Sequence, residues 1–187
     1  MKKTIVYIDG YNLYYGLVKG TKYKWLDMPV LVKSMINDDH EIVAVKYFTA
    51  PVKTYPFDAA ATERQNVYLQ AISVNPAVKT VLGFYAKHPS WQPARADTCK
   101  KCDTAKFGLV PIVKLEEKRS DVNIAEALRY ECSKTVIVLN PQPSFSVHLK
   151  KAASFYKNIP RDLPARCQLP EEVKVGNVVL RRPTAWR

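Results

Sequence analysis

The segment Thr4-Ile5-Val6-Tyr7-Ile8-Asp9-Gly10-Tyr11-Asn12 indicates the fold class of this 187-residue chain. Residues 4–8 are an uninterrupted run of β-forming residues, typical of a strand buried on both faces of a parallel sheet. Asp9-Gly10 ends the run, and the apolar pattern over 11–18 indicates a short helix. A buried strand that leads directly into a helix is the repeating unit of α/β folds.

The same alternation continues along the chain. Helices are expected at 28–36, where Asp27 can cap the first turn and Pro29 lies within it, and also at 56–71, after Ser120, and at 145–156. Strands are expected at 41–48, 78–85, 110–115, 135–139 and 177–180. We therefore predict a single three-layer α/β domain over 1–187 with a mostly parallel sheet. A polar insertion loop at about 88–106 and a Pro-rich C-terminal tail from about 160 complete the expected organisation.

The charge balance favours a polyanionic partner. Lys plus Arg number 29 against 17 for Asp plus Glu, a net charge of +12, and such an excess most simply suits nucleic acid. A protein that merely has a high isoelectric point is the alternative. The N-terminal apolar run is too short for a signal peptide, and no stretch approaches the ~20 apolar residues of a membrane span. We expect a cytoplasmic protein with no membrane partner.

Two acidic segments follow expected strands. Asp9 ends the first strand with Asn12 beside it, and Asp121 falls in the first turn of the helix after the strand at 110–115. Ligands of parallel α/β sheets bind beyond the carboxyl ends of the strands, and Mg²⁺ or Mn²⁺ prefers carboxylate oxygens. We predict that Asp9 and Asp121 share a metal site, to which Glu116 or Glu117 can add a carboxylate. Simple helix capping is the alternative for each Asp.

Three motifs carry a resemblance to a known family. The stretches YIDGYNLYYG (7–16), EEKRSDVNIA (116–125) and VIVLNPQP (136–143), with a closing Pro-x-x-Trp, resemble the NYN-domain family of LabA-like and PIN-like proteins. The resemblance runs from Lys3 to Trp186. It implies a PIN-like Rossmannoid fold and a divalent-metal centre that hydrolyses RNA phosphodiesters, with Asp9, Asn12 and Asp121 as the catalytic residues.

The chain departs from this family in its acidic centre. No Asp occurs between Asp121 and Asp162, so the strand that ends in a Ser-x-Asp-Ser-Asp motif, with its following helix, is missing as a unit of roughly 30 residues. In a second alignment, 136–145 replaces that strand without its acidic residues. The expected function is a metal-dependent endoribonuclease with impaired activity. The alternative is a catalytically inactive RNA-binding or regulatory module of the same fold.

Candidate RNA contacts follow from the basic and aromatic residues. Tyr11 and Tyr15 lie on the turn after Asp9, where aromatic rings can stack on unpaired bases, although core packing is the alternative. Phosphate contacts are expected from Arg64, Lys118 and Arg119. The expected partner is therefore single-stranded RNA, and a homodimer that covers an exposed sheet edge is a further expectation.

A cysteine pair adds a second metal hypothesis. Cys99 and Cys102 form a CxxC motif in the insertion loop, which is half of the ligand set of a zinc ribbon. A structural Zn²⁺ is one interpretation of this pair, and an unligated pair is the other.

Overall fold

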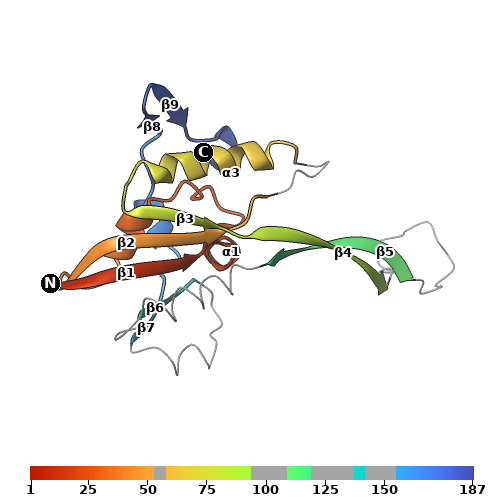
Figure 1. The fold of residues 1–187 in the computed structure, drawn as a ribbon, viewed down its shortest axis with the longest axis horizontal. Coiled ribbons are helices and arrows are strands. Elements are labelled where there is room, and N and C mark those ends of the chain that lie inside the picture. Colours follow the sequence, from red (N-terminus) through yellow and green to blue (C-terminus); the bar gives the residue numbers. More distant parts are fainter. Residues whose placement is uncertain (53–57, 94–108, 119–136, 142–154) are drawn as a thin grey trace.

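A parallel sheet of three strands forms the centre of the computed structural model, which describes residues 1–52, 58–93, 109–118, 137–141 and 155–187 (Figure 1). The strands are β1 (Lys2–Asp9), β2 (His40–Thr49) and β3 (Val78–Leu82), in the order β1-β2-β3. Asp9 lies opposite Phe48, and Phe48 lies opposite Val81. The three strands therefore end at one edge, and the prediction of a mixed α/β fold with a parallel sheet is confirmed.

Helices connect these strands and cover the sheet. The first strand leads into α1 (Gly10–Leu13) and a π-helical turn, η1 (Tyr14–Val18). The next helix, α2 (Met28–Lys33), begins as predicted: the Asp27 carboxylate accepts the Val30 N–H, and proline lies in the first turn. The crossover from β2 to β3 contains α3 (Ala61–Ser73), which starts later than the expected helix at 56–71.

The insertion expected at 88–106 begins as a strand. An antiparallel ribbon of β4 (Phe84–Pro93) and β5 (Leu109–Lys118) extends from the end of β3 (Figure 1). The strand expected at 78–85 is thus interrupted at Gly83, and the one expected at 110–115 lies in this ribbon rather than in the parallel sheet. Pro89 and Pro93 argued against a strand, but in a two-stranded ribbon each strand has an outward side where a missing N–H costs nothing.

The C-terminal third forms further small elements. A parallel pair is made by β6 (Ile137–Asn140) and β7 (Phe155–Asn158), so Phe155 and Tyr156 are in a strand and not at the end of a helix. The rest of the helix expected at 145–156 lies outside the described residues. Beyond it come α6 (Leu163–Arg166), the hairpin of β8 (Glu172–Val175) and β9 (Val178–Arg181), and the 3₁₀ turn η3 (Thr184–Trp186).

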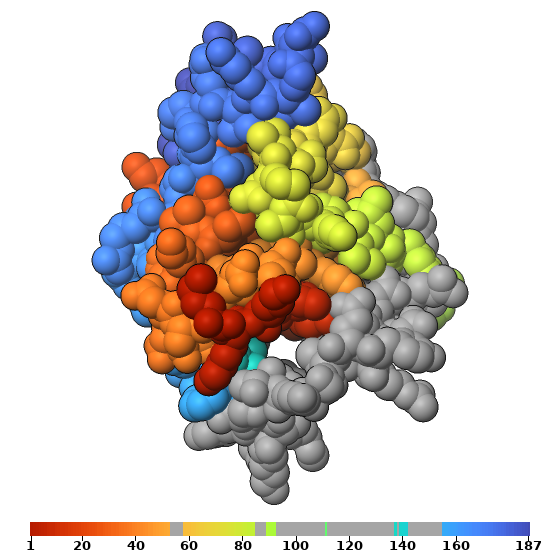
Figure 2. Space-filling view, turned by 60° about the vertical axis from the view of Figure 1, so that its left-hand side comes forward, coloured from red at the N-terminus to blue at the C-terminus, as the bar shows by residue number. Residues whose placement is uncertain are grey.

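This C-terminal segment is part of the core. Figure 2 shows the blue C-terminal residues packed against the orange and yellow parts of the chain, and the β8–β9 hairpin contacts α3. The segment contributes five buried side chains to the core: Ile159, Leu163, Cys167, Val173 and Leu180. Residues beyond 160 therefore stabilise the domain. None of the helices within the described ranges is long and apolar enough to cross a bilayer.

A close backbone approach fixes the turn from β1 into α1. A Cβ atom on Gly10 would lie 2.7 Å from the Phe48 carbonyl oxygen and 2.8 Å from the ring of Tyr47. Because both neighbours belong to buried parts of β2, neither has room to move away. Gly10 thus permits the first helix to pack against the end of the second strand.

We predict that Gly10→Ala destabilises the protein by about 3 kcal/mol, because the added methyl group overpacks a rigid contact. Gly20→Ala is the matched control, since Gly20 has a φ of +77° but no atom lies within 4 Å of the place that its added methyl group would take. The cost at Gly20 should be about 1 kcal/mol from backbone strain alone. Urea unfolding of both variants gives the comparison. Equal losses would contradict the role assigned to the Gly10 contact.

Candidate functional site

Asp9 acts as the cap of the first helix. Its Oδ1 accepts the backbone N–H of Asn12 at 3.0 Å, and its Oδ2 accepts the Asn12 side-chain amide at 2.7 Å. The predicted neighbours Asp9 and Asn12 are therefore in direct contact at the carboxyl edge of the sheet. The capping role considered from the sequence is the one this geometry shows.

The remaining residues of the predicted metal site are placed only in part. Glu116 and Glu117 lie in β5, opposite Ala86 and Tyr85, at the base of the ribbon where it leaves β3. Asp121 and Arg119 lie outside the described residues, as do Cys99 and Cys102, and Lys118 is placed as the last residue of β5. The described residues contain no group of three His, Cys, Asp or Glu side chains that could hold a metal ion.

The start of α3 brings a charged pair to the same sheet edge. The side chain of Gln65 joins α3 to the end of β2, because its amide donates to the Ala50 carbonyl at 2.9 Å and its oxygen accepts the Val52 N–H at 2.7 Å. The adjacent Arg64 guanidinium donates to the Asp58 carboxylate at 2.5 Å. Arg64, predicted to contact RNA phosphate, thus has a carboxylate partner within the chain.

The pKa values of two further side chains depend on the charges of this pair: that of Tyr14 on Arg64 and Asp58, and that of Lys24 on Arg64. Burial raises the pKa of Tyr14 above its ordinary value of 10.0, while Arg64 lowers it in part and Asp58 raises it. Burial lowers the pKa of Lys24, and the positive charge of Arg64 lowers it further. The charge of Arg64 therefore influences the pKa values of both Tyr14 and Lys24. We call the set the strand-end cluster, which consists of Asp9, Asn12, Tyr14, Lys24, Asp58 and Arg64.

An exposed aromatic pair lies next to this cluster. The rings of Tyr11 and Tyr15 are 4.4 Å apart between centroids, and their residues are 42% and 48% exposed. The Lys19 ammonium group lies 4.3 Å from the centroid of the Tyr15 ring, and Tyr14 packs edge-on against the same ring at 5.2 Å. The two tyrosines are accessible, as expected, and together with Lys19 they form a cationic aromatic surface.

Sequence reasoning missed three members of the cluster: Tyr14, Lys24 and Asp58. They lie in the π-helical turn, in the following loop and just before α3, where nothing in the local pattern distinguishes them. Their contribution depends on the position of Arg64, which is set by the docking of α3 on β2. These three residues can therefore be recognised only from the tertiary structure.

No protein-family model matches the chain, and no solved structure matches it. The chain is similar to 6-hydroxy-3-succinoylpyridine 3-monooxygenase HspA of Pseudomonas putida (strain DSM 28022 / S16), with 30% identity over 166 residues. The match covers 74% of this chain and 52% of the relative, so the chain spans about half the length of that protein. Since 74% of 187 residues is about 138, some 28 positions of the aligned stretch have no counterpart in this chain.

This similarity corrects the function predicted from the sequence. The relative is named as a monooxygenase, which points to an oxidoreductase rather than to an endoribonuclease or an inactive RNA-binding module. The predicted Mg²⁺ or Mn²⁺ and the structural Zn²⁺ are corrected with it, because the relative is named as a monooxygenase and the described residues contain no group that could hold a metal ion. An RNA partner and a homodimer stay predictions.

The first strand–helix turn does not fit the pyrophosphate of a flavin or nicotinamide cofactor. Dinucleotide-binding folds place that group on a glycine-rich turn, at the free N–H groups of a helix N-terminus. Here Gly10 is packed against β2, and the Asp9 carboxylate accepts the Asn12 N–H at the start of the helix. A pyrophosphate at this turn would meet a like charge.

We predict opposite pKa changes at Tyr14 in two charge variants. Arg64→Gln should raise the Tyr14 pKa, because it removes a cation and leaves Asp58 unneutralised. Asp58→Asn should lower it, because it removes the negative charge that raises the Tyr14 pKa. Ring-carbon NMR of ¹³C-labelled tyrosine measures both, with Tyr14→Phe for assignment.

Buried Tyr68 is the internal control for this titration. Burial raises its pKa well above the ordinary value, so its signal should stay that of the protonated phenol in both variants. Shifts of the same sign for Tyr14 in Arg64→Gln and Asp58→Asn would show that the strand-end cluster is not electrostatically coupled.

Proposed function

We propose that this chain is an oxidoreductase of the monooxygenase class that acts on a small aromatic compound. The observation that carries the proposal is the 30% identity to a protein named as a 6-hydroxy-3-succinoylpyridine monooxygenase. A monooxygenase places one oxygen atom of O₂ in its substrate and reduces the other to water. Two electrons from a reductant such as NADH balance the reaction.

The strand-end cluster and its aromatic surface support a substrate of this kind. The exposed side chains of Tyr11 and Tyr15 suit a planar ring, since aromatic side chains pair with offset rings at centroid distances of about 4.5–7 Å. The phenol of Tyr14 is protonated at neutral pH, since its pKa lies above the ordinary value of 10.0, and its hydroxyl can donate a hydrogen bond to a ring oxygen. Arg64 and Lys24 supply positive charge beside it.

We also propose that the domain has the three-layer PIN-like fold of the NYN family, carrying a different chemistry. The order of β1, β2 and β3, with Asp9 at their carboxyl edge, supports this assignment. A shared fold does not fix a shared reaction, because function depends on the residues placed at the site.

The experiment is oxygen incorporation under ¹⁸O₂. The purified chain is incubated with 6-hydroxy-3-succinoylpyridine and NADH or NADPH, with and without added FAD or FMN. The expected result is a product with one ¹⁸O atom and matching consumption of reductant and oxygen. Arg64→Gln should reduce turnover by about tenfold, because a charge-assisted contact contributes roughly 1.5 kcal/mol or more.

Lys79→Gln is the matched control, since it removes the same charge from an exposed position in β3. Its turnover should equal that of the unmodified chain. Absence of labelled product with every combination of reductant and flavin would contradict the proposal. Equal losses of turnover in Arg64→Gln and Lys79→Gln would contradict the role given to Arg64.

A further inference from the structure

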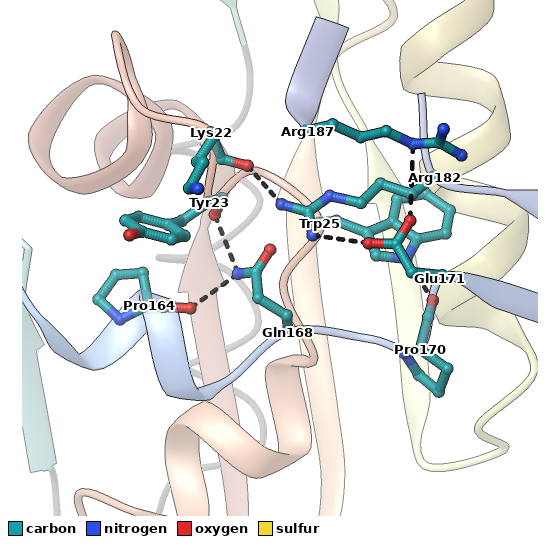
Figure 3. Close-up of polar contacts among 9 residues, drawn as sticks. All are labelled: Lys22, Tyr23, Trp25, Pro164, Gln168, Pro170, Glu171, Arg182 and Arg187. Atoms are coloured by element: carbon teal, nitrogen blue, oxygen red, sulfur yellow. Dashed lines mark hydrogen bonds and ion pairs between the residues drawn. The ribbon is translucent and has the colours of Figure 1, made fainter. Parts of the chain in front are cut away.

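A pocket that is separate from the strand-end cluster opens between the loop after η1 and the C-terminal segment. It has a volume of about 640 Å³, within the range of small-molecule sites. Tyr23 contributes the aromatic part of its lining, and the polar side chains around it (Figure 3) are Lys22, Gln168, Glu171, Arg182 and Arg187. None of these residues belongs to the strand-end cluster.

Hydrogen bonds between distant parts of the chain hold the walls of this pocket. The Arg182 guanidinium donates to the Lys22 carbonyl at 2.7 Å. The Gln168 amide donates to the Pro164 carbonyl at 2.7 Å and to the Tyr23 carbonyl at 3.3 Å (Figure 3). These bonds join groups of the chain itself and fix the pocket walls, and a site fixed in this way has a lower entropic cost of binding.

The lining carries an excess of positive charge. Glu171 is its one carboxylate: it accepts from Arg182 at 3.1 Å and lies 3.6 Å from the Arg187 guanidinium. With Lys22, the three cations exceed this carboxylate by two charges. The Arg182 side chain is only 12% exposed, so its charge is less screened by solvent than a surface charge.

Two polar atoms of the pocket residues are buried without a hydrogen-bond partner. They are the Arg182 Nε and the Gln168 Oε1, and no other buried side-chain nitrogen or oxygen in the described part of the chain shares this state. Leaving such a group unpaired costs about 1–3 kcal/mol. Unsatisfied buried groups in folded proteins call for an explanation.

We propose that this pocket binds an organic oxyanion, a carboxylate or a phosphate ester, that carries a planar ring. The oxyanion group lies among Lys22, Arg182 and Arg187, because planar guanidinium groups match carboxylate and phosphate oxygens. The ring lies against Tyr23, whose centroid is 6.0 Å from the Lys22 ammonium group. This inference is independent of the proposed oxidoreductase activity.

Calorimetric titration with benzoate, phenyl phosphate and inorganic phosphate tests the proposal. One of the two ring-bearing anions should bind more tightly than inorganic phosphate, and the tighter of the two identifies the preferred oxyanion. Arg187→Gln should weaken that binding by about tenfold, since it removes one charge-assisted contact. Glu171→Gln should tighten it several-fold, because the amide oxygen still accepts from Arg182 while the competing negative charge is gone.

Arg181→Gln is the matched control. Arg181 is the neighbour of Arg182 in the chain, pairs with Glu172 and is 71% exposed, so the substitution removes the same net charge away from the pocket. Its affinity should be unchanged, and melting temperatures of all three variants verify folding. Equal weakening in Arg181→Gln and Arg187→Gln, no response to Glu171→Gln in a folded protein, or no binding of either ring-bearing anion would overturn the proposal.

Discussion

The buried indole of Trp25 is the contact on which the rest of the structure depends. Trp25 has no exposed surface, packs 5.9 Å from the Tyr68 ring and 6.3 Å from the Trp186 ring, and donates its N–H to the Pro170 carbonyl at 2.7 Å. One side chain therefore joins the N-terminal half, α3 and the C-terminal segment. A buried Trp with a satisfied N–H combines a large apolar area with a directional bond, so it fixes position as well as proximity.

Backbone hydrogen bonds near Trp25 also join the N-terminal part of the chain to the C-terminal segment. The Leu169 N–H donates to the Trp25 carbonyl at 2.8 Å, and the Asp27 N–H donates to the Cys167 carbonyl at 2.8 Å. Tyr68 adds a buried hydrogen bond from its hydroxyl to the Leu26 carbonyl at 3.0 Å. The loop from η1 to α2 is consequently held between α3 and the C-terminal residues. The walls of the pocket described above, with Lys22 and Tyr23 on one side and residues 165–187 on the other, are a direct result of these contacts.

The strand-end cluster illustrates how one sheet edge can serve different chemistries. In parallel α/β folds the helix N-terminus after the first strand is an anion site when its N–H groups are free, and a metal site when several carboxylates converge there. In this chain the Asp9 carboxylate and the Asn12 amide bond to each other. The described part of this edge also carries phenol, guanidinium and ammonium groups beside exposed tyrosine rings, which supports the aromatic substrate proposed above.

Elements with a local cause were predictable from the sequence: the strand at 4–8, the helix that Asp27 caps and the contact between Asp9 and Asn12 follow from periodicity and from neighbours three residues apart. The burial expected for that strand on both faces was wrong, because Ile5 is 37% exposed and the other residues of the run are only partly buried. Three features could be seen in the tertiary structure alone. They are the packing of the Pro-rich residues beyond 160, the pairing of 84–93 with 109–118, and the set of side chains that surround Arg64 and Arg182. Those outcomes depend on contacts between residues as much as 160 positions apart, such as the bond from Arg182 to Lys22, and no short-range pattern encodes them. Neither the sequence nor the tertiary structure was sufficient to assign the reaction class. A carboxylate that follows a strand has the same sequence signature whether it binds a metal or caps a helix.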